Sequence, residues 1–424
     1  MKSININYIY LIIIFINISL IYAQSQVKYE IPLSYTVNTS LPVIEILLGE
    51  ETNPNPFVLD IGQEKSWIYK KREETTEKKN LETLQYNIFS VEGEAKKDHC
   101  YLSNKEKNKI LKIGNFDYLE VPKVNGDEPF LNGASLNNIV SNAENFDHKD
   151  KNYGFNIDFP SKKLSIGKFD DNEKQNLKKL ELKGNKWQFT LNAVFFDDIN
   201  KNVKNGNEYK ILNTTKGILV NKDILLETVY APFYVPKDFF DYLEDNSYFY
   251  DEKDKLCERK IEQGSIIYLC DKNKKDKIKN MNLVLNNKYV LPLTKKHLLK
   301  CSTNSELCEF VIKYNPKVKL FALGVDFLKN LNVYFMKNEN SVYLKGIEIF
   351  DCDMAASQFK AIGQKDIMKA LFQLFKTFSV IILIFVFLFI FFYVHSKFRG
   401  NAYTDKENDD KKDEELVDID KEKN

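Results

Sequence analysis

The stretch Phe57–Ile68 reads FVLDIGQEKSWI, and it decides more about the fold than any other part of the chain. Three apolar residues lead into Asp60, Gly62 follows two positions later, and Trp67 follows seven positions after the aspartate. A short apolar run bounded by a turn predicts a buried β-strand. The alternative for Asp60 is a solvated aspartate in a turn, but the glycine and the tryptophan favour a functional carboxylate at the end of that strand.

Further segments follow Phe57–Ile68 in order along the chain. Their residues are Tyr86, Gly93 and Asp98; Lys186–Leu191; Leu323–Leu328; Val333–Phe335; and Val342–Leu344. Taken together, these segments resemble the pepsin-like aspartic peptidases. In that family the first motif is Asp-Thr-Gly-Ser with a tryptophan seven residues after the aspartate, and a later hairpin is the flap, whose tyrosine covers the bound substrate. The last segments resemble the C-terminal signature of the family.

The resemblance implies an all-β, bilobal fold in which each lobe contributes one catalytic loop to a peptide-binding cleft. It implies that Asp60 is a catalytic carboxylate and that Gly62, Tyr86 and Thr228 contact substrate, with no cofactor and no metal. The chemistry requires two carboxylates that share a proton, because two like charges at about 3 Å cannot both ionise. One acts as base towards a bound water, and the other acts as acid towards the scissile carbonyl.

The first loop departs from the family motif. Ile61 stands where the family has threonine, and isoleucine cannot make the hydrogen bond that joins the two loops. Its apolar bulk should desolvate Asp60 and raise the pKa of that carboxyl. Gln63 replaces a serine that supports the catalytic carboxylate in the family. These changes predict impaired catalysis.

The second loop departs further. Residues Ile224–Tyr230 read ILLETVY, which fits the family's apolar run and Asp-Thr-Gly-Thr if Glu227 stands for the aspartate and Val229 for the glycine. Glutamate reaches about 1.5 Å further than aspartate, and a misplacement of about 1 Å can cost roughly 10²-fold in rate. Valine also adds a β-branched side chain where close backbone approach is required. A competing alignment puts Asp223 in the role but loses both the threonine and the glycine, so we favour Glu227.

The flap differs from the family as well. Tyr86 is present, but Asn87–Phe89 replaces the usual glycine-containing tip, which predicts a stiffer flap. The alternative for Tyr86 is an ordinary strand tyrosine, and its spacing to Gly93 and Asp98 favours the flap.

Two hydrophobic segments frame this region. The first has Lys2 near its start, an apolar centre, and Ala23 before a polar stretch, which is typical of a secretory signal peptide. The second, Thr377–Val394, is uncharged and just long enough to span a bilayer, and basic residues follow it as expected on the cytoplasmic side. The sequence predicts a single-pass type I membrane protein of the secretory or endolysosomal system or the cell surface, with its folded part lumenal or extracellular.

The pattern of apolar and polar residues between these two hydrophobic segments predicts a mostly β structure. Short apolar alternations such as Val43–Leu48 and Leu283–Leu285 predict strands, and Lys237–Glu244 after Pro236 predicts a short helix. The predicted divisions are a signal peptide (1–23), an N-terminal lobe (27–183), a C-terminal lobe (184–350), a juxtamembrane stem (351–376), a transmembrane helix (377–394) and a disordered cytoplasmic tail (395–424).

All six cysteines lie in the predicted lumenal part. An even number in an oxidising compartment suggests disulfides, although six cysteines allow fifteen connectivities. The resemblance places a second-lobe disulfide of the family at Cys270 and Cys301. The cysteines whose pairing stays open are Cys100, Cys257, Cys308 and Cys352. Sequons at Asn38 and Asn213 predict glycosylation on the same side of the membrane.

Composition and motifs argue against several classes of function. A net charge of +1 gives no bulk field for nucleic acid, the four histidines have no metal-ligand spacing, and no serine or cysteine nucleophile motif stands out. The sequence predicts a membrane-anchored pepsin-like homologue, catalytically impaired, that binds a peptide or protein in its cleft. The alternatives are an active acid endopeptidase that uses Asp60 and Glu227, and a structural or adhesive surface protein whose cleft is filled by its own side chains.

Overall fold

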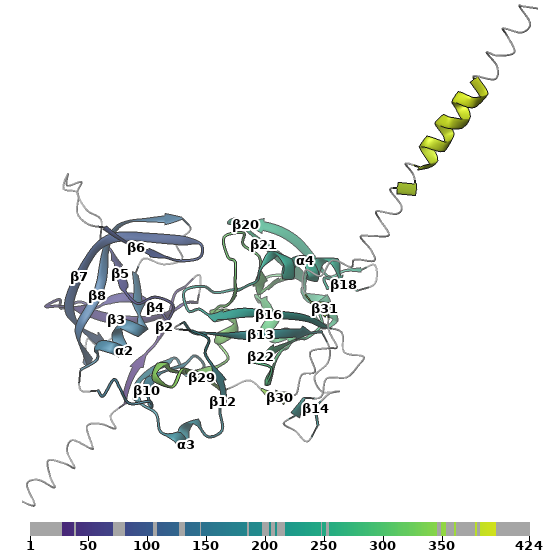
Figure 1. Ribbon diagram of the computed structural model, residues 1–424. Coiled ribbons are helices and arrows are strands. Elements are labelled where there is room, and N and C mark those ends of the chain that lie inside the picture. The colour runs from purple at the N-terminus through teal and green to yellow at the C-terminus, as the bar shows by residue number, and fades with distance from the viewer. Residues whose placement is uncertain are drawn as a thin grey trace, which may run out of the picture. The chain divides into compact units, whose positions relative to one another are not determined.

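The computed structural model describes residues 28–395 apart from 38–39, 71–80, 105–107, 127–131, 145, 185, 197–202, 205–207, 210–216, 247, 252–253, 346–348, 353–359, 362–377 and 380–381. The predicted signal peptide, both sequon asparagines (Asn38 and Asn213) and the tail from residue 396 lie outside the described residues. The chain divides into one compact unit, Met1–Ile362, and a second, Gly363–Asn424. The sheets and the candidate site belong to the first unit, whose elements are labelled in Figure 1.

The N-terminal half of this unit is built on an eight-stranded sheet with the order β2-β3-β4-β9-β5-β8-β7-β6. Its strands are β2 (Ser34–Tyr35), β3 (Pro42–Leu48), β4 (Asn55–Asp60), β5 (Ser66–Tyr69), β6 (Leu81–Gln85), β7 (Phe89–Ser103), β8 (Lys109–Gly126) and β9 (Asn132–Ser135). The strands predicted at Val43–Leu48 and Phe57–Leu59 are confirmed as β3 and β4, because their apolar side chains are buried in the core. Helix α2 (Leu136–Asn142) follows β9 and is capped by Ser135.

The C-terminal half is built on an eleven-stranded sheet with β31 beside the path β14-β15-β30-β23-β22-β13-β16-β27-β17-β26. Its strands are β13 (Gln188–Phe195), β14 (Val203–Lys204), β15 (Glu208–Tyr209), β16 (Gly217–Leu226), β17 (Phe233–Tyr234), β22 (Met281–Leu285), β23 (Tyr289–Leu293), β26 (Ile312–Lys313), β27 (Phe321–Leu323), β30 (Phe350–Cys352) and β31 (Lys360–Ala361). Because β30 and β31 pair within this sheet, the C-terminal lobe extends past the predicted boundary at residue 350.

Smaller elements complete this half. A second sheet has the order β20-β21-β25-β24, and a short hairpin pairs β18 with β19. The bounds are β18 (Tyr250–Asp251), β19 (Asp254–Lys255), β20 (Cys257–Glu262), β21 (Ser265–Asp271), β24 (Leu299–Cys301) and β25 (Leu307–Phe310), with α4 (Lys237–Asp245), η2 (Lys272–Lys277), α5 (Lys295–Leu298) and α6 (Val325–Leu328). Helix α4 confirms the predicted helix, since its apolar face, Phe239, Phe240 and Leu243, is buried.

A six-stranded sheet joins the two halves in the order β1-β11-β10-β28-β29-β12. Its strands are β1 (Tyr29–Pro32), β10 (Tyr153–Asp158), β11 (Lys163–Lys168), β12 (Lys178–Glu181), β28 (Asn332–Met336) and β29 (Ser341–Lys345). The late hairpin β28–β29 lies between strands of the first half, so Phe155 pairs with Phe335 and Leu180 pairs with Val342. Residues far apart in sequence therefore form one continuous layer.

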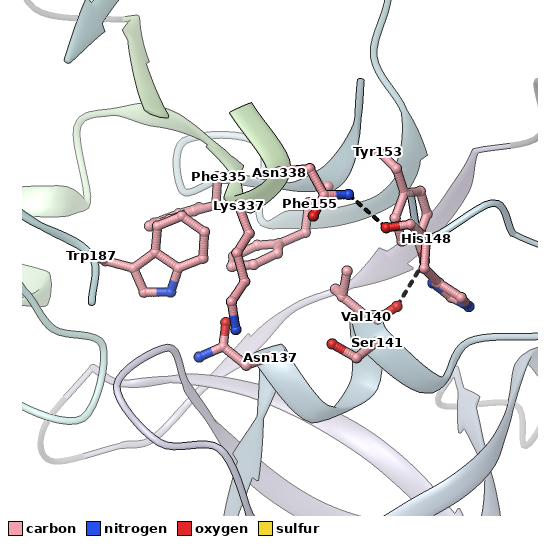
Figure 2. A pocket seen from close by; sticks show the side chains of 11 residues that line it. Asn137, Val140, Ser141, His148, Tyr153, Phe155, Trp187, Phe335, Lys337 and Asn338 are labelled. Atoms are coloured by element: carbon pink, nitrogen blue, oxygen red, sulfur yellow. Dashed lines mark hydrogen bonds between the residues drawn. The ribbon is translucent and has the colours of Figure 1, made fainter. Parts of the chain in front are cut away.

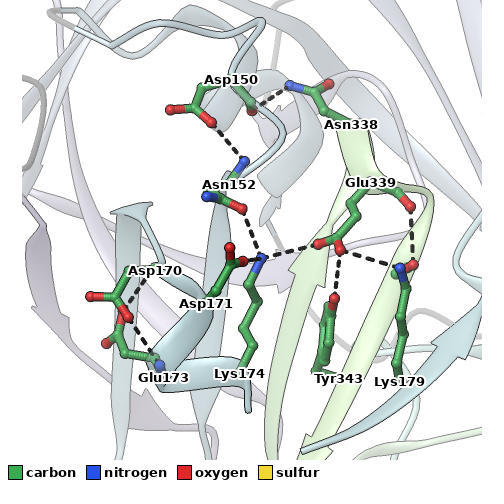
Figure 3. A network of polar contacts seen from close by, with 11 residues as sticks. Asp150, Asn152, Asp170, Asp171, Glu173, Lys174, Lys179, Asn338, Glu339 and Tyr343 are labelled. Atoms are coloured by element: carbon green, nitrogen blue, oxygen red, sulfur yellow. Dashed lines mark hydrogen bonds and ion pairs between the residues drawn. The ribbon is translucent and has the colours of Figure 1, made fainter.

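A buried lysine forms polar contacts that connect this shared sheet to neighbouring segments (Figure 3). Lys174, in α3 (Asp171–Lys174), is 5% exposed, and its ammonium group contacts Asn152 and the carboxylate of Glu339 in η3 (Lys337–Glu339). Glu339 also accepts hydrogen bonds from Lys179 and Tyr343. A buried charge needs such partners because an unpaired one is strongly unfavourable, and this network explains how a lysine is accommodated beside the sheet.

The disulfide predicted between Cys270 and Cys301 is wrong. The bonds are Cys257–Cys270 and Cys301–Cys308, and each joins residues that lie directly opposite on paired strands. Strand β25 separates β21 from β24, so Cys270 and Cys301 lie two strands apart. At about 4.8 Å per strand spacing, that separation exceeds the roughly 7 Å limit for a disulfide. Cys100 and Cys352 belong to neither bond.

The described helical residues of the second unit are 378–379 and 382–395, and their apolar side chains are exposed. They cover part of the predicted membrane segment Thr377–Val394, and the remainder is outside the described residues. None of the helices in the described part of the chain has both the length and the apolar character needed to cross a membrane.

Candidate active site

Two loops that carry a buried carboxyl group each follow a strand whose end pairs in parallel with a neighbouring strand. Strand β4 ends at Asp60, beside β9, and β16 ends at Leu226, beside β27. Each pairing is parallel, and the Glu227 N–H extends the second one by donating to the carbonyl of Leu323 at 3.0 Å. We call Asp60–Gln63 the N-terminal loop and Glu227–Tyr230 the C-terminal loop. The fold thus brings two separate carboxylates to equivalent strand ends.

Asp60 is buried and fully engaged by hydrogen bonds. Its Oδ1 accepts from the backbone N–H groups of Gly62 at 2.8 Å and Gln63 at 3.2 Å, and its Oδ2 accepts from the Tyr86 hydroxyl at 2.6 Å. Burial raises the pKa of Asp60 to about 6, although these three hydrogen bonds favour the ionised form. Asp60 is therefore an ionised acceptor at neutral pH that becomes protonated in mild acid.

Glu227 lies against Asp60 across Gly62. A Cβ built on Gly62 would lie 3.1 Å from Oε2 of Glu227 and 3.5 Å from Oδ1 of Asp60, so both carboxyl groups crowd over this glycine. Burial, and then the charge of Asp60, raise the pKa of Glu227 to about 8. Near neutral pH the pair therefore holds one proton, on Glu227, while Asp60 is ionised. Pairs with separated pKa values are typical of acid–base sites.

The structure also decides between the two carboxylates proposed for the C-terminal loop. Asp223 lies within β16, opposite Thr190, and its carboxylate pairs with Lys183 at 2.7 Å. Glu227 instead lies beside Asp60, since a Cβ on Gly62 would lie 3.1 Å from Oε2 of Glu227 and 3.5 Å from Oδ1 of Asp60. The geometry therefore brings Glu227, rather than Asp223, to the N-terminal loop.

One threonine joins the two loops. The Thr228 hydroxyl donates to the carbonyl of Leu59 at 2.7 Å and accepts from the N–H of Ile61 at 3.3 Å. Ile61 is fully buried and has no side-chain hydroxyl with which to return these bonds. The link between the loops is therefore made from one side, as the sequence predicted for isoleucine at this position.

The flap is a hairpin of β6 and β7 whose turn lies over Asp60. Tyr86 is 6% exposed, its hydroxyl accepts from Trp67 Nε1 at 3.0 Å while donating to Asp60, and its ring stacks on Phe89 at 4.2 Å. Gly93 is required in β7, because a Cβ there would lie 2.4 Å from the carbonyl of Glu120. The predicted flap tyrosine is thus present, and it caps the aspartate.

Three contributions were not predicted from the sequence. The side chain of Gln63 donates to the Gln85 carbonyl of the flap at 2.9 Å, and the Tyr230 hydroxyl accepts from the N–H of Asn87 at 2.9 Å. Asn137 of α2 donates to backbone carbonyls of the N-terminal loop. Gln63 and Tyr230 carried a visible signal, since each is a long side chain that stands where the family motif has a serine or a threonine.

Asn137 also lines a small pocket behind the N-terminal loop (Figure 2). The walls include Phe155, Trp187 and Lys337, and the pocket volume is about 40 Å³, which suits water rather than a peptide. Lys337 pairs with Glu64, next to the loop, at 3.4 Å. These contacts hold the loop from behind. Among the residues that the structure describes, no group of three or more His, Cys, Asp or Glu side chains is placed to hold a metal ion.

Sheets that end in paired acidic loops, share a joining layer and carry a tyrosine flap define the pepsin-like fold. Comparison with solved structures agrees: 399 chains match, among them an aspartic proteinase from Irpex lacteus, with a TM-score of 0.51 and 10% sequence identity over 76% of this chain and 98% of that one. At this identity the likeness shows the fold alone. No protein-family model matches the sequence, and no curated protein sequence matches it either.

Proposed function

We propose that this chain is a catalytically impaired pepsin-like homologue that binds an extended peptide or protein segment between its flap and its acidic loops. One observation carries the proposal: the Oδ2 atom of Asp60 accepts a hydrogen bond from Tyr86 at 2.6 Å. In the family mechanism the paired carboxylates must hold and activate a water. Here Oδ2 of Asp60, the base, already accepts a hydrogen bond from the Tyr86 hydroxyl. The acid is Glu227, whose side chain is longer than that of aspartate.

Peptide binding by this site would use main-chain hydrogen bonds. An extended segment adds to backbone hydrogen-bonding groups as an extra strand does, and the flap turn Gln85–Ile88 has such groups above the carboxylates, where the N–H of Asn87 is bonded to Tyr230. The buried, partly protonated pair adds a hydrogen-bond donor at Glu227 and an acceptor at Asp60. The scaffold therefore retains recognition chemistry even where turnover is lost.

The proposed setting is a membrane of the secretory or endolysosomal system or the cell surface, with the sheets on the lumenal or outer side. Exposed apolar side chains along residues 382–394, such as Phe385 at 68% and Phe389 at 74%, support an anchor there, because a row of this kind needs an apolar surrounding. The signal-peptide pattern at the N-terminus and the cysteines of both disulfides fit the same route.

A second candidate is a weak endopeptidase that uses Asp60 and Glu227. It is favoured by the separated pKa values of the pair, about 6 and about 8, which leave one proton shared between two buried carboxyls. Such a pair would work best between these two values, hence nearer neutral pH than the acid optimum expected from the family. The two candidates differ in one property, which is turnover.

The test is peptide turnover by the full chain purified in detergent, with an unbiased peptide mixture from pH 3 to pH 9, followed by mass spectrometry. The variant Asp60→Asn is the control for contaminating proteases. We expect peptides to be retained by the protein and recovered intact. Cleavage by the wild type that disappears in Asp60→Asn would replace the impaired homologue with the endopeptidase, and failure to retain any peptide would remove the binding function.

A further inference from the structure

Tyr230 reaches from the C-terminal loop to the flap. Its side chain is 3% exposed, and its hydroxyl oxygen accepts from the N–H of Asn87 at 2.9 Å. Asn87 and Ile88 form the flap turn immediately after Tyr86. The phenol of one half of the molecule therefore holds the backbone of a hairpin that belongs to the other half.

The backbone of Tyr230 is itself held firmly. Its carbonyl accepts from the N–H of Val325 at 2.8 Å, at the start of α6, and the next carbonyl, of Ala231, accepts from Asp326 at 2.7 Å. Gly324 permits this approach, because a Cβ there would lie 2.6 Å from the Tyr230 carbonyl oxygen. The phenol consequently projects from a fixed base rather than from a free loop, which makes its hold on the flap effective.

Three further bonds close the flap turn Gln85–Ile88. Gln63 holds the Gln85 carbonyl at 2.9 Å, Tyr86 holds Asp60 at 2.6 Å, and Lys317 of the C-terminal half contacts the Ile88 carbonyl at 3.4 Å. Every residue of the turn thus makes a bond to one of the two halves. Of these bonds, only the one to Tyr230 takes up a backbone N–H group, that of Asn87.

That N–H group is what an entering peptide needs. A segment that binds in extended form presents backbone carbonyls to donors on the host, and in this turn the N–H of Asn87 is occupied by the Tyr230 hydroxyl. A peptide carbonyl and the phenol oxygen are interchangeable acceptors for an N–H. Exchange between them opens the turn with little loss of hydrogen bonding.

We propose that Tyr230 is the residue that gates the site: it latches the flap shut over Asp60 and Glu227, and an extended peptide enters by replacing the Tyr230 hydroxyl at the N–H of Asn87. The proposal rests on the proposed function, since it names how that function's ligand enters. It selects for ligands that offer a free backbone carbonyl in a strand-like segment, and it excludes helical or folded ligands.

The first experiment measures the latch without any ligand. Hydrogen–deuterium exchange is followed in flap peptides covering residues 81–92 of the full chain, in the wild type and in Tyr230→Phe, which removes only the hydroxyl. We expect exchange at Asn87 to become about tenfold faster, in line with the loss of one net hydrogen bond. Tyr248→Phe is the matched control, because Tyr248 is a buried tyrosine of the same half whose hydroxyl donates to the Lys279 carbonyl, away from the flap.

Equal flap exchange in the wild type, Tyr230→Phe and Tyr248→Phe would overturn the latch, whatever the chain binds. The second experiment adds an unbiased peptide mixture and measures the amount retained. Retention several-fold higher in Tyr230→Phe than in Tyr248→Phe supports the gate, whereas equal retention with a loosened flap overturns it. If no variant retains any peptide, the proposed binding function fails, and the exchange result still decides the latch.

Discussion

The N-terminal and C-terminal loops carry different parts of the motif that the sequence resembles. The N-terminal loop keeps an aspartate and a glycine but has Ile61 between them, whereas the C-terminal loop keeps Thr228 between a glutamate and a valine. Thr228 supplies both hydrogen bonds between the loops, and Gly62 supplies the space in which the Glu227 carboxyl lies. What one loop lacks, the other still provides.

This comparison separates holding the loops together from performing catalysis. The contact between the loops needs one hydroxyl and one glycine, and each is present once. Catalysis by the family mechanism needs two equivalent carboxylates with access to water, and here the carboxylates differ in length, pKa and hydrogen bonding. The same fold geometry can therefore hold two loops that lack the symmetry the family reaction requires.

The largest effect is expected from Glu227→Gln, and it depends on pH. The folded-state pKa of Glu227 is about 8 against an ordinary value of 4.5, so the native state keeps a proton that the unfolded chain releases. The contribution of Glu227 to the free energy of unfolding is fully present below pH 4.5 and is lost as pH rises through 8. Between pH 4.5 and 9, glutamine should gain on the order of 4 kcal/mol relative to wild type in urea unfolding.

Asp223→Asn is the control for that experiment, because Asp223 is partly exposed and pairs with Lys183 on the surface of its strand. Exposed pairs contribute about 0–1 kcal/mol, so its unfolding free energy should follow that of wild type across the pH range. If the unfolding free energies of Glu227→Gln and wild type ran parallel across the pH range, Glu227 would be ionised in the folded protein. The contrast in pKa between the two loops would then disappear.

A smaller effect is expected from Thr228→Val, which keeps the shape and removes the hydroxyl. The carbonyl of Leu59 and the N–H of Ile61 would then be buried without that partner, at a cost of roughly 2–4 kcal/mol in the free energy of unfolding. The control is Ile61→Val, which removes one methylene group from the opposite loop and should cost about 1 kcal/mol. Equal losses in denaturant unfolding would show that Thr228 does not join the loops.

The smallest effect is expected from Gly62→Ala. Its Cβ would lie 3.1 Å from a terminal oxygen of Glu227, and that carboxyl has little room to retreat because it is buried, so we expect a loss of about 1 kcal/mol in thermal or urea unfolding. Gly114→Ala is matched to it, since its Cβ would lie 3.2 Å from the Glu144 carboxylate, which is partly exposed and can move. A cost at Gly114 equal to that at Gly62 would argue against crowding of the two carboxyls.

The sequence predicted the features that depend on local pattern. Strands β3 and β4 and helix α4 follow from apolar spacing and turn residues, whereas the flap at Tyr86 and the role of Glu227 follow from the resemblance to the family's motifs. The consequence of Ile61 was also predictable, because a side chain without a hydroxyl cannot form a hydrogen bond in any fold.

Features that depend on register or on side-chain direction were not predictable. The pairing of Cys270 with Cys257 is set by which residues lie opposite across β20 and β21, and spacing along the chain does not reveal that register. The reach of Tyr230 to Asn87 joins positions 143 residues apart. The end of the C-terminal lobe was placed too early because β30 is short and carries little apolar pattern of its own.

The shared sheet has a consequence for how the chain is made. Strands β10 and β12 come from the first half, yet their hydrogen-bonding neighbours β28 and β29 are synthesised more than 150 residues later. During translation the edges of β10 and β12 must therefore wait unpaired, and unpaired edges attract other strands. One continuous layer therefore implies a long interval with unpaired strand edges, and folding can finish only after the hairpin at residues 332–345 has left the ribosome.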